Sequence, residues 1–123
     1  MCLVVTKNTR VRTVKRERTV YKIVERFENY FATPYQHMKI NIGETYRLGE
    51  KILKIPRNKE VIYGFHSFMT LEDVREEIKD WDYYKNPLIV KCTIPVGAKI
   101  VKGTSFSLES YVSSEIEYVK IIK

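Results

Sequence analysis

The clearest pattern of hydrophobic and polar positions lies within residues 61–81. It begins with three residues that favour β structure, Val61, Ile62 and Tyr63, and Gly64 after them is typical of a turn. Residues 65–68 then continue as a second short extended piece. The first part of this stretch therefore predicts two short strands separated by a turn.

A helix signal comes directly after it. Thr70 offers a hydroxyl that can cap a helix, and Asp73 stands three residues further on, as in a capping box with Asp in place of Glu. The next apolar residues recur at spacings of three, four and three, which places them on one face of a helix: Leu71, Val74, Ile78 and Trp81. The spacing predicts an amphipathic helix over residues 71–81 that lies on a sheet.

The remaining strands are predicted from alternation and from apolar runs. Residues 19–27 alternate as a half-buried strand does, with Val20 and Val24 on one face and Tyr21, Ile23 and Phe27 on the other. The run at 88–94 is typical of a buried strand. Further strands are expected at 45–48, 98–101 and 115–122, with a hairpin joining 51–55 to 61–65; 29–42 and 103–110 are expected to be loops, and 111–114 an irregular turn.

Together these elements predict an α+β fold. We expect a mixed, mainly antiparallel sheet of six or seven short strands and one main helix at about residues 71–81. A chain of 123 residues with 44% hydrophobic side chains is long enough to bury a core in one domain. The predicted organisation is one compact domain over residues 19–123, preceded by a basic arm or edge strand over residues 1–18.

Charge is distributed unevenly along the chain. The net charge is +7, and residues 1–26 hold eight basic side chains against Glu17 and Glu25, whereas the remainder is almost neutral. A basic leading segment favours an anionic partner, either nucleic acid or an acidic protein surface. The expected contact residues are Arg10, Arg12, Lys15, Arg16 and Arg18. A Lys- and Arg-rich edge strand that discourages aggregation, or a disordered tail, would also fit this composition.

The sequence contains few candidates for a catalytic, metal or binding site. The sequence has no glycine-rich phosphate loop, no paired Cys/His metal spacing and no nucleophile elbow, so neither an enzyme nor a metal centre is favoured. His66 is the best single site candidate because it follows a strand, although a structural hydrogen-bonded role is the alternative. Glu115 and Glu117 form a Glu-x-Glu pair on one strand face, which solvated acids would equally explain. Four tyrosines could line a ring-stacking groove or lie scattered on half-exposed strands: Tyr21, Tyr35, Tyr46 and Tyr63.

The cysteine content and the hydropathy of the chain indicate the cellular compartment in which the protein is expected. Cys2 and Cys92 do not make a disulfide framework, and Cys92 in a strand is expected to be a small buried hydrophobe. No secretory signal and no apolar run long enough to span a membrane is visible. An intracellular protein without membrane insertion is therefore expected, in a host cytoplasm or a virion if it is viral.

Six segments in order carry a resemblance: YKIV, ATPY, IGETY, GFHSF with the capped helix, IVKCTIPVGAKIVKGT, and SYVSSEIEYVKII. From residue 19 onward the chain resembles a group of small uncharacterised proteins of phages, large DNA viruses and bacteria. More distantly it is similar to the rifampicin ADP-ribosyltransferase type of fold, although Tyr21-Lys22 stands where such enzymes have His-Gly. That resemblance implies a cleft for a nucleotide, with NAD or ADP-ribose as cofactor. The implied lining residues are Tyr21, His66, Tyr111 and Glu117, of which His66 and Glu117 are the candidates for catalysis.

These observations support two hypotheses for function. The charge asymmetry and the missing catalytic motifs favour a non-enzymatic binding or structural protein, such as a viral or virion component, docked in a larger assembly by its basic arm. The alternative is a nucleotide- or NAD-binding domain of ADP-ribosyltransferase type, active or degenerate. The oligomeric state is not predicted.

Overall fold

The computed structural model describes residues 3–34, 38–48, 53–80, 86–105 and 108–122. Its sheet has one half in which the strands follow one another in the spatial order β6 (Thr45–Arg47), β12 (Glu115–Ile121), β9 (Pro87–Ile94) and β3 (Arg18–Arg26). The other half continues with β8 (Phe65–Phe68), β11 (Leu108–Ser113), β10 (Lys99–Ser105), β1 (Leu3–Val4) and β7 (Glu60–Val61). Three further strands pair at the margins: β2 (Arg12–Thr13) with β10, β4 (Phe31–Ala32) with β3, and β5 (Lys39–Ile40) with β4.

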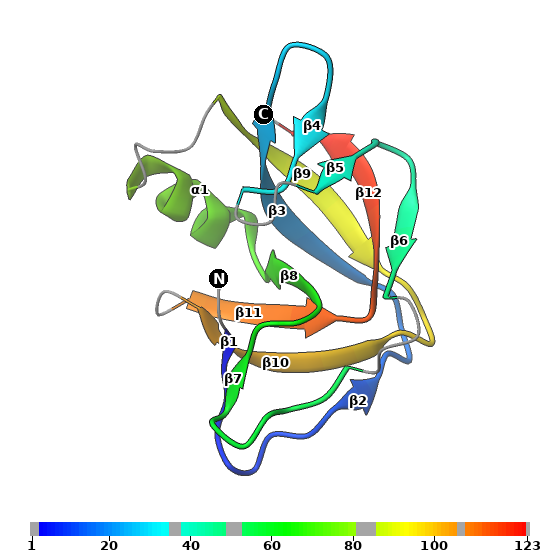
Figure 1. The fold of residues 1–123 in the computed structure, drawn as a ribbon, viewed down its shortest axis with the longest axis vertical. Coiled ribbons are helices and arrows are strands. Elements are labelled where there is room, and N and C mark those ends of the chain that lie inside the picture. The colour runs from blue at the N-terminus through cyan, green and yellow to red at the C-terminus, as the bar shows by residue number, and fades with distance from the viewer. Residues whose placement is uncertain (1–2, 35–37, 49–52, 81–85, 106–107, 123) are drawn as a thin grey trace.

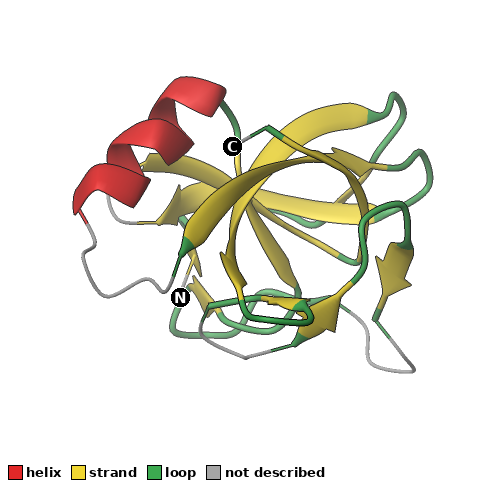
Figure 2. Cartoon of the chain, turned by 90° about the horizontal axis from the view of Figure 1, so that it is seen from above, coloured by secondary structure: helices red, strands yellow, loops and turns green. Residues whose placement is uncertain are grey.

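The two halves of the sheet run in different directions. Figure 1 shows β3, β9 and β12 running steeply through the upper part of the molecule, while β10 and β11 lie below them and run nearly horizontally. Seen from above, the strands curve around a central core and the single helix lies on the outside (Figure 2). The described strand pairs are all antiparallel.

The prediction of an α+β fold is wrong. The described residues form a twelve-stranded sheet and one helix of ten residues, so the fold is mainly β. The largest error concerns residues 103–105 and 108–113, which were expected to belong to a loop and a turn but lie in strands β10 and β11, paired from Ile100↔Ser113 to Ser105↔Leu108. Ser, Gly and Glu have low strand propensity, and here partners on both sides override that local preference.

Other predicted elements differ in extent or partner. The expected loop 29–42 contains the short strands β4 and β5. The expected hairpin between 51–55 and 61–65 is absent from the described part, since Leu53–Ile55 is not strand and β7 pairs with β1 instead. Residues 51–52 lie outside the described residues.

The helix is confirmed as α1 (Leu71–Asp80). Thr70 Oγ1 accepts a hydrogen bond of 3.1 Å from the Asp73 amide, which is the expected cap. Val74 is fully buried in a cluster with Ile23, Phe68 and Ile89, so the helix covers one face of β3, β9 and β8. Trp81 lies outside the described residues. Within the described residues, no helix is long and apolar enough to cross a membrane.

The main core lies on the opposite face of β3 and β9. Val20, Val24 and Val90 are there, with Ile116 and Tyr118 of β12, all of them fully buried. A second cluster joins β1, β7, β10 and β11 through Leu3, Val5, Leu53, Val61, Val101 and Val112. The first residues of the chain therefore contribute buried side chains to the fold.

Candidate functional site

The basic arm, described from Leu3 to Arg18, is attached to the rest of the protein at several places. At its start, β1 pairs with β7 and β10, and the Val5 amide donates to the Lys59 carbonyl at 3.0 Å. At its end, the Val14 amide donates to the Ala98 carbonyl at 2.8 Å, and the Val14 carbonyl accepts from the Gly97 amide at 2.9 Å. Val5 and Val14 are both buried. Between them, β2 (Arg12–Thr13) also pairs with β10, so the arm is fixed by backbone pairing and by burial.

The cations of this arm project into solvent. Its exposed side chains include Lys7, Arg10, Arg12, Lys15 and Arg16. Among the described residues, none of these five forms an ion pair with a carboxylate; the ion pairs that occur are Arg47–Glu115, Lys79–Glu76 and Lys102–Glu109. Lys99 of β10 adds a further exposed cation beside the arm, since its Nζ donates to Thr13 Oγ1 at 2.6 Å. The arm therefore presents a cationic surface that the described part of the chain leaves unneutralised.

Arg18 differs from the other arm cations. Its Nη1 donates to the Tyr111 hydroxyl at 3.0 Å, and its guanidinium carbon lies 5.4 Å from the centre of the Tyr111 ring. This contact joins β3 to β11 across the two halves of the sheet. Arg18 is exposed like the other arm cations, but it also joins two parts of the fold.

The four residues implied to line a nucleotide cleft do not share one face of the described structure. Tyr21 packs with the helix cluster, and Tyr111 packs in the main core on the other side of the sheet. His66 neighbours Ser67, the pairing partner of Tyr111, so its ring points to the opposite face of β8. Glu117 alternates with the buried Ile116 and so faces away from the main core. Tyr111 therefore lies on the opposite face of the sheet from Tyr21 and His66.

The predicted tyrosine groove is likewise divided. Tyr46 packs edge-on against Tyr118, with ring centres 5.6 Å apart, on the main-core side, whereas Tyr21 lies on the helix side. Tyr63 is 42% exposed, beyond β7. Tyr35 lies outside the described residues. No common stacking surface is formed by the three described tyrosines.

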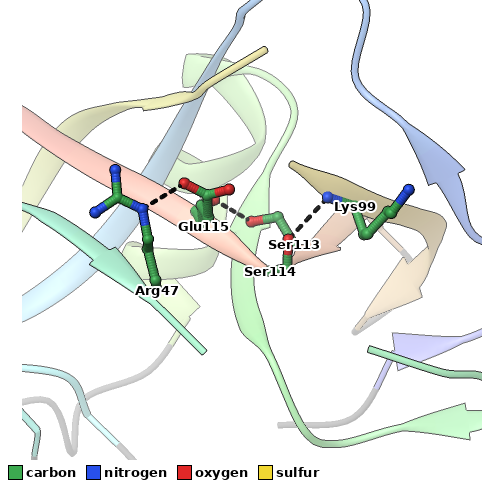
Figure 3. A network of polar contacts seen from close by, with 5 residues as sticks. All are labelled: Arg47, Lys99, Ser113, Ser114 and Glu115. Atoms are coloured by element: carbon green, nitrogen blue, oxygen red, sulfur yellow. Dashed lines mark hydrogen bonds and ion pairs between the residues drawn. The ribbon is translucent and has the colours of Figure 1, made fainter. Parts of the chain in front are cut away.

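Glu115 belongs to a network of polar contacts with neighbouring strands. Glu115 Oε1 accepts a hydrogen bond of 2.8 Å from Arg47 Nε of β6, in a network shown in Figure 3. The Ser113 hydroxyl donates to the Glu115 carbonyl at 2.9 Å, and the Ser114 hydroxyl accepts from the Lys99 amide at 2.8 Å. These contacts tie β6, β10 and β12 at the point where β11 passes into β12. Glu115 therefore has a structural role in this network.

A scan of protein-family models, a search of curated proteins and a search of solved structures each found no match to this chain. Among the described residues, no group of three or more His, Cys, Asp and Glu side chains could hold a metal ion. Function must therefore be inferred from the chain's own surfaces and buried groups.

Lys22 is the charged residue that the sequence interpretation missed. It alternates with Val20 and Val24, and its side chain accordingly points into the core, with only 9% of its surface exposed. Its Nζ donates to the His66 carbonyl at 2.5 Å. Burial lowers the pKa of Lys22 from 10.5 to about 8, against a smaller opposing effect of Cys92. The two-residue period of this strand was the signal that could have revealed it.

His66 is buried beside that amine. Its Nε2 lies 2.8 Å from the Ile62 carbonyl, and because a carbonyl only accepts, Nε2 carries the proton of the neutral ring. Burial is the main reason that the pKa of His66 falls from 6.5 to about 4, and the charge of Lys22 lowers it further, against the hydrogen bond to Ile62. The structural hydrogen-bonded role considered for this histidine is the one that these contacts provide.

Cys92 is buried, as the sequence predicts, and its thiol is expected to be unreactive in the folded protein. Burial raises its pKa from 9.0 to about 12, so the nucleophilic thiolate is about 1,000-fold scarcer at neutral pH than in the unfolded chain. In a Cys2→Ser background, labelling of Cys92 by DTNB is expected to be at least about 100-fold slower in buffer than in urea. Equal rates in the two solutions would contradict the buried placement.

Proposed function

We propose that this protein is a non-enzymatic binding protein that docks on nucleic acid through its basic arm, as part of a larger intracellular assembly. The observation that carries the proposal is the group of five exposed arm cations without a carboxylate partner among the described residues. Cations in this state can each replace a counterion at a phosphate.

The attachment of the arm supports binding as well. A free basic tail would lose conformational entropy when it is ordered on a partner, whereas this arm is already held at Val5, at β2 and at Val14. Less free energy is then spent on ordering when phosphates are contacted. Residues 1–18 contain no aromatic side chain for base stacking. The proposed contacts are therefore mainly with the phosphate backbone and read little sequence.

The test is a variant with Arg10→Gln, Arg12→Gln, Lys15→Gln and Arg16→Gln. Its affinity for a short labelled DNA duplex is measured by fluorescence anisotropy between about 50 and 200 mM salt. The slope of log K against log salt should become shallower by about 3 to 4, since each lost phosphate contact contributes about 0.9. Arg18 is kept because it holds Tyr111.

A matched control removes four exposed cations elsewhere, through Arg26→Gln, Arg75→Gln, Lys79→Gln and Lys120→Gln. These belong to the end of β3, to α1 and to β12, whereas β2 lies at the opposite end of the molecule (Figure 1). Both variants have the same net charge, so only an effect of position separates them. Equal slopes in the two variants would refute the role of the arm. Binding to an acidic polypeptide but not to DNA would show that the partner is a protein surface.

A further inference from the structure

The two halves of the sheet share few backbone pairs. β3 and β8 share one described backbone pair, Tyr21↔Phe68. By comparison, β3 pairs with β9 along eight positions, from Arg18↔Ile94 to Glu25↔Pro87, and β8 pairs with β11 along four. The path of backbone pairing through the sheet is therefore weak at β3 and β8, and side chains must supply part of the contact.

Lys22 supplies such a contact between β3 and β8, and the His66 ring, on the other face of β8, supports the turn that precedes this strand. The Lys22 amine crosses from β3 and donates to the backbone carbonyl of His66. The His66 ring, on the other face, donates from Nε2 to the Ile62 carbonyl and so holds the turn that leads into β8, where Gly64 has a φ of +129°. The conformation of β8 thus depends on a neutral imidazole and a buried amine.

Protonation of the His66 ring at low pH would disturb these contacts. The Nδ1 atom of His66 is buried and has no hydrogen-bond partner among the described residues. A proton added there becomes a buried donor without an acceptor, and it places a second positive charge near Lys22. Both effects favour a state in which the imidazole reaches water.

No other described group of the junction offsets this charge. Cys92 of β9 lies near Lys22, Tyr118 of β12 is paired with Cys92, and both are neutral in acid. Tyr111 of β11 lies on the far face of β8 from the His66 ring. Two buried carboxylates lie on neighbouring elements, Glu25 on β3 and Glu77 on α1, but neither contributes to the shifts of Lys22 or His66.

We propose that β8 is an acid-sensitive latch at its junction with β3: protonation of His66 opens β8 and the turn that leads into it, while β3, β9 and β12 stay paired.

The size of the response is set by linkage. A proton binds His66 with a pKa of 6.5 in the open state and about 4 in the closed state, so opening becomes easier as the pH falls below 6.5 and levels off below 4. Between about pH 7.5 and about pH 5 the opening constant should rise about 30-fold.

Hydrogen exchange tests the latch. Exchange rates of backbone amides, corrected for the intrinsic pH dependence, give the opening constant at each pH. The amides of β8 should open about 30-fold more often at about pH 5 than at about pH 7.5, whereas those in the centre of β9 should change little. An equal rise in β8 and β9 would indicate global acid unfolding and would overturn the proposal, as would no rise in β8.

The His66→Gln variant isolates the titrating group. A glutamine amide can still donate to the Ile62 carbonyl but gains no proton in this pH range. The acid response of β8 should disappear in this variant, and its persistence would refute the role of His66. Should the variant not fold, the comparison of β8 with β9 in the unaltered protein still decides the question.

Discussion

Gly64→Ala is expected to lower the free energy of unfolding by about 4 kcal/mol. Gly64 has a φ of +129°, a conformation that side chains with a Cβ rarely adopt. A Cβ at this position would overlap Val112 Cγ1, and it would lie 3.2 Å from Leu53 Cδ1 and 3.3 Å from the Ser113 carbonyl oxygen. Val112 and Leu53 are buried, at 0% and 3% exposure, so neither has space to move aside.

Gly43→Ala is the matched control for this prediction. Gly43 also has a positive φ, +95°, but nothing lies within 4 Å of the position that its Cβ would take. Only the backbone cost remains, and the expected loss is about 1 to 2 kcal/mol. Urea unfolding of the two variants measures both values. Similar losses in the two variants would show that the packing around Gly64 yields easily and that the contact with Val112 is not tight.

Lys22→Met is expected to raise the free energy of unfolding by about 2 kcal/mol at pH 7. The fall of the Lys22 pKa from 10.5 to about 8 means that burying the charged amine costs about 3 kcal/mol at neutral pH. The hydrogen bond from Lys22 to the His66 carbonyl stabilises the folded protein by about 1 kcal/mol, and the variant loses this contribution. Methionine fills a similar volume without a charge.

The pH dependence gives the same experiment a second readout. Between pH 8 and 10.5 the unfolded chain still binds a proton at Lys22 that the folded protein has released, so the free energy of unfolding should rise with pH across this window. Lys22→Met should lack that rise. Lys120→Met, on the exposed part of β12, should change stability by less than about 0.5 kcal/mol and keep the rise. A destabilised Lys22→Met would mean that the hydrogen bond outweighs the cost of burial.

A charged group held at a cost in free energy often marks a functional position. Lys22 is such a group, and it lies at the junction of β3 and β8, where the proposed latch would open. The nucleic-acid proposal rests on different residues, namely the exposed cations of the basic arm. Failure of either proposal therefore leaves the other standing.

Local patterns in the sequence were sufficient where neighbouring residues decide the structure. The Thr70 cap and the stripe of Leu71, Val74 and Ile78 specify a helix because all its hydrogen bonds are made within ten residues. The alternation of residues 19–27 and the apolar run at 88–94 specify β3 and β9 in the same way. The concentration of charge in the arm is also a property of the sequence itself.

Features that depend on contacts between residues distant in the sequence were decided only by the tertiary structure. Residues 103–105 and 108–113 become strand because β8 and β1 flank the paired strands β10 and β11, and Ser110 and Ser113 are buried despite their polarity. The candidate cleft of Tyr21, His66, Tyr111 and Glu117 depended on which faces of different strands meet, and sequence order does not contain that information. The sequence by itself thus determined the helix, the main strands and the basic arm, whereas only the folded sheet placed Lys22 against His66. The reason is physical: period and capping act within one element, whereas burial and pairing join residues 44 positions apart.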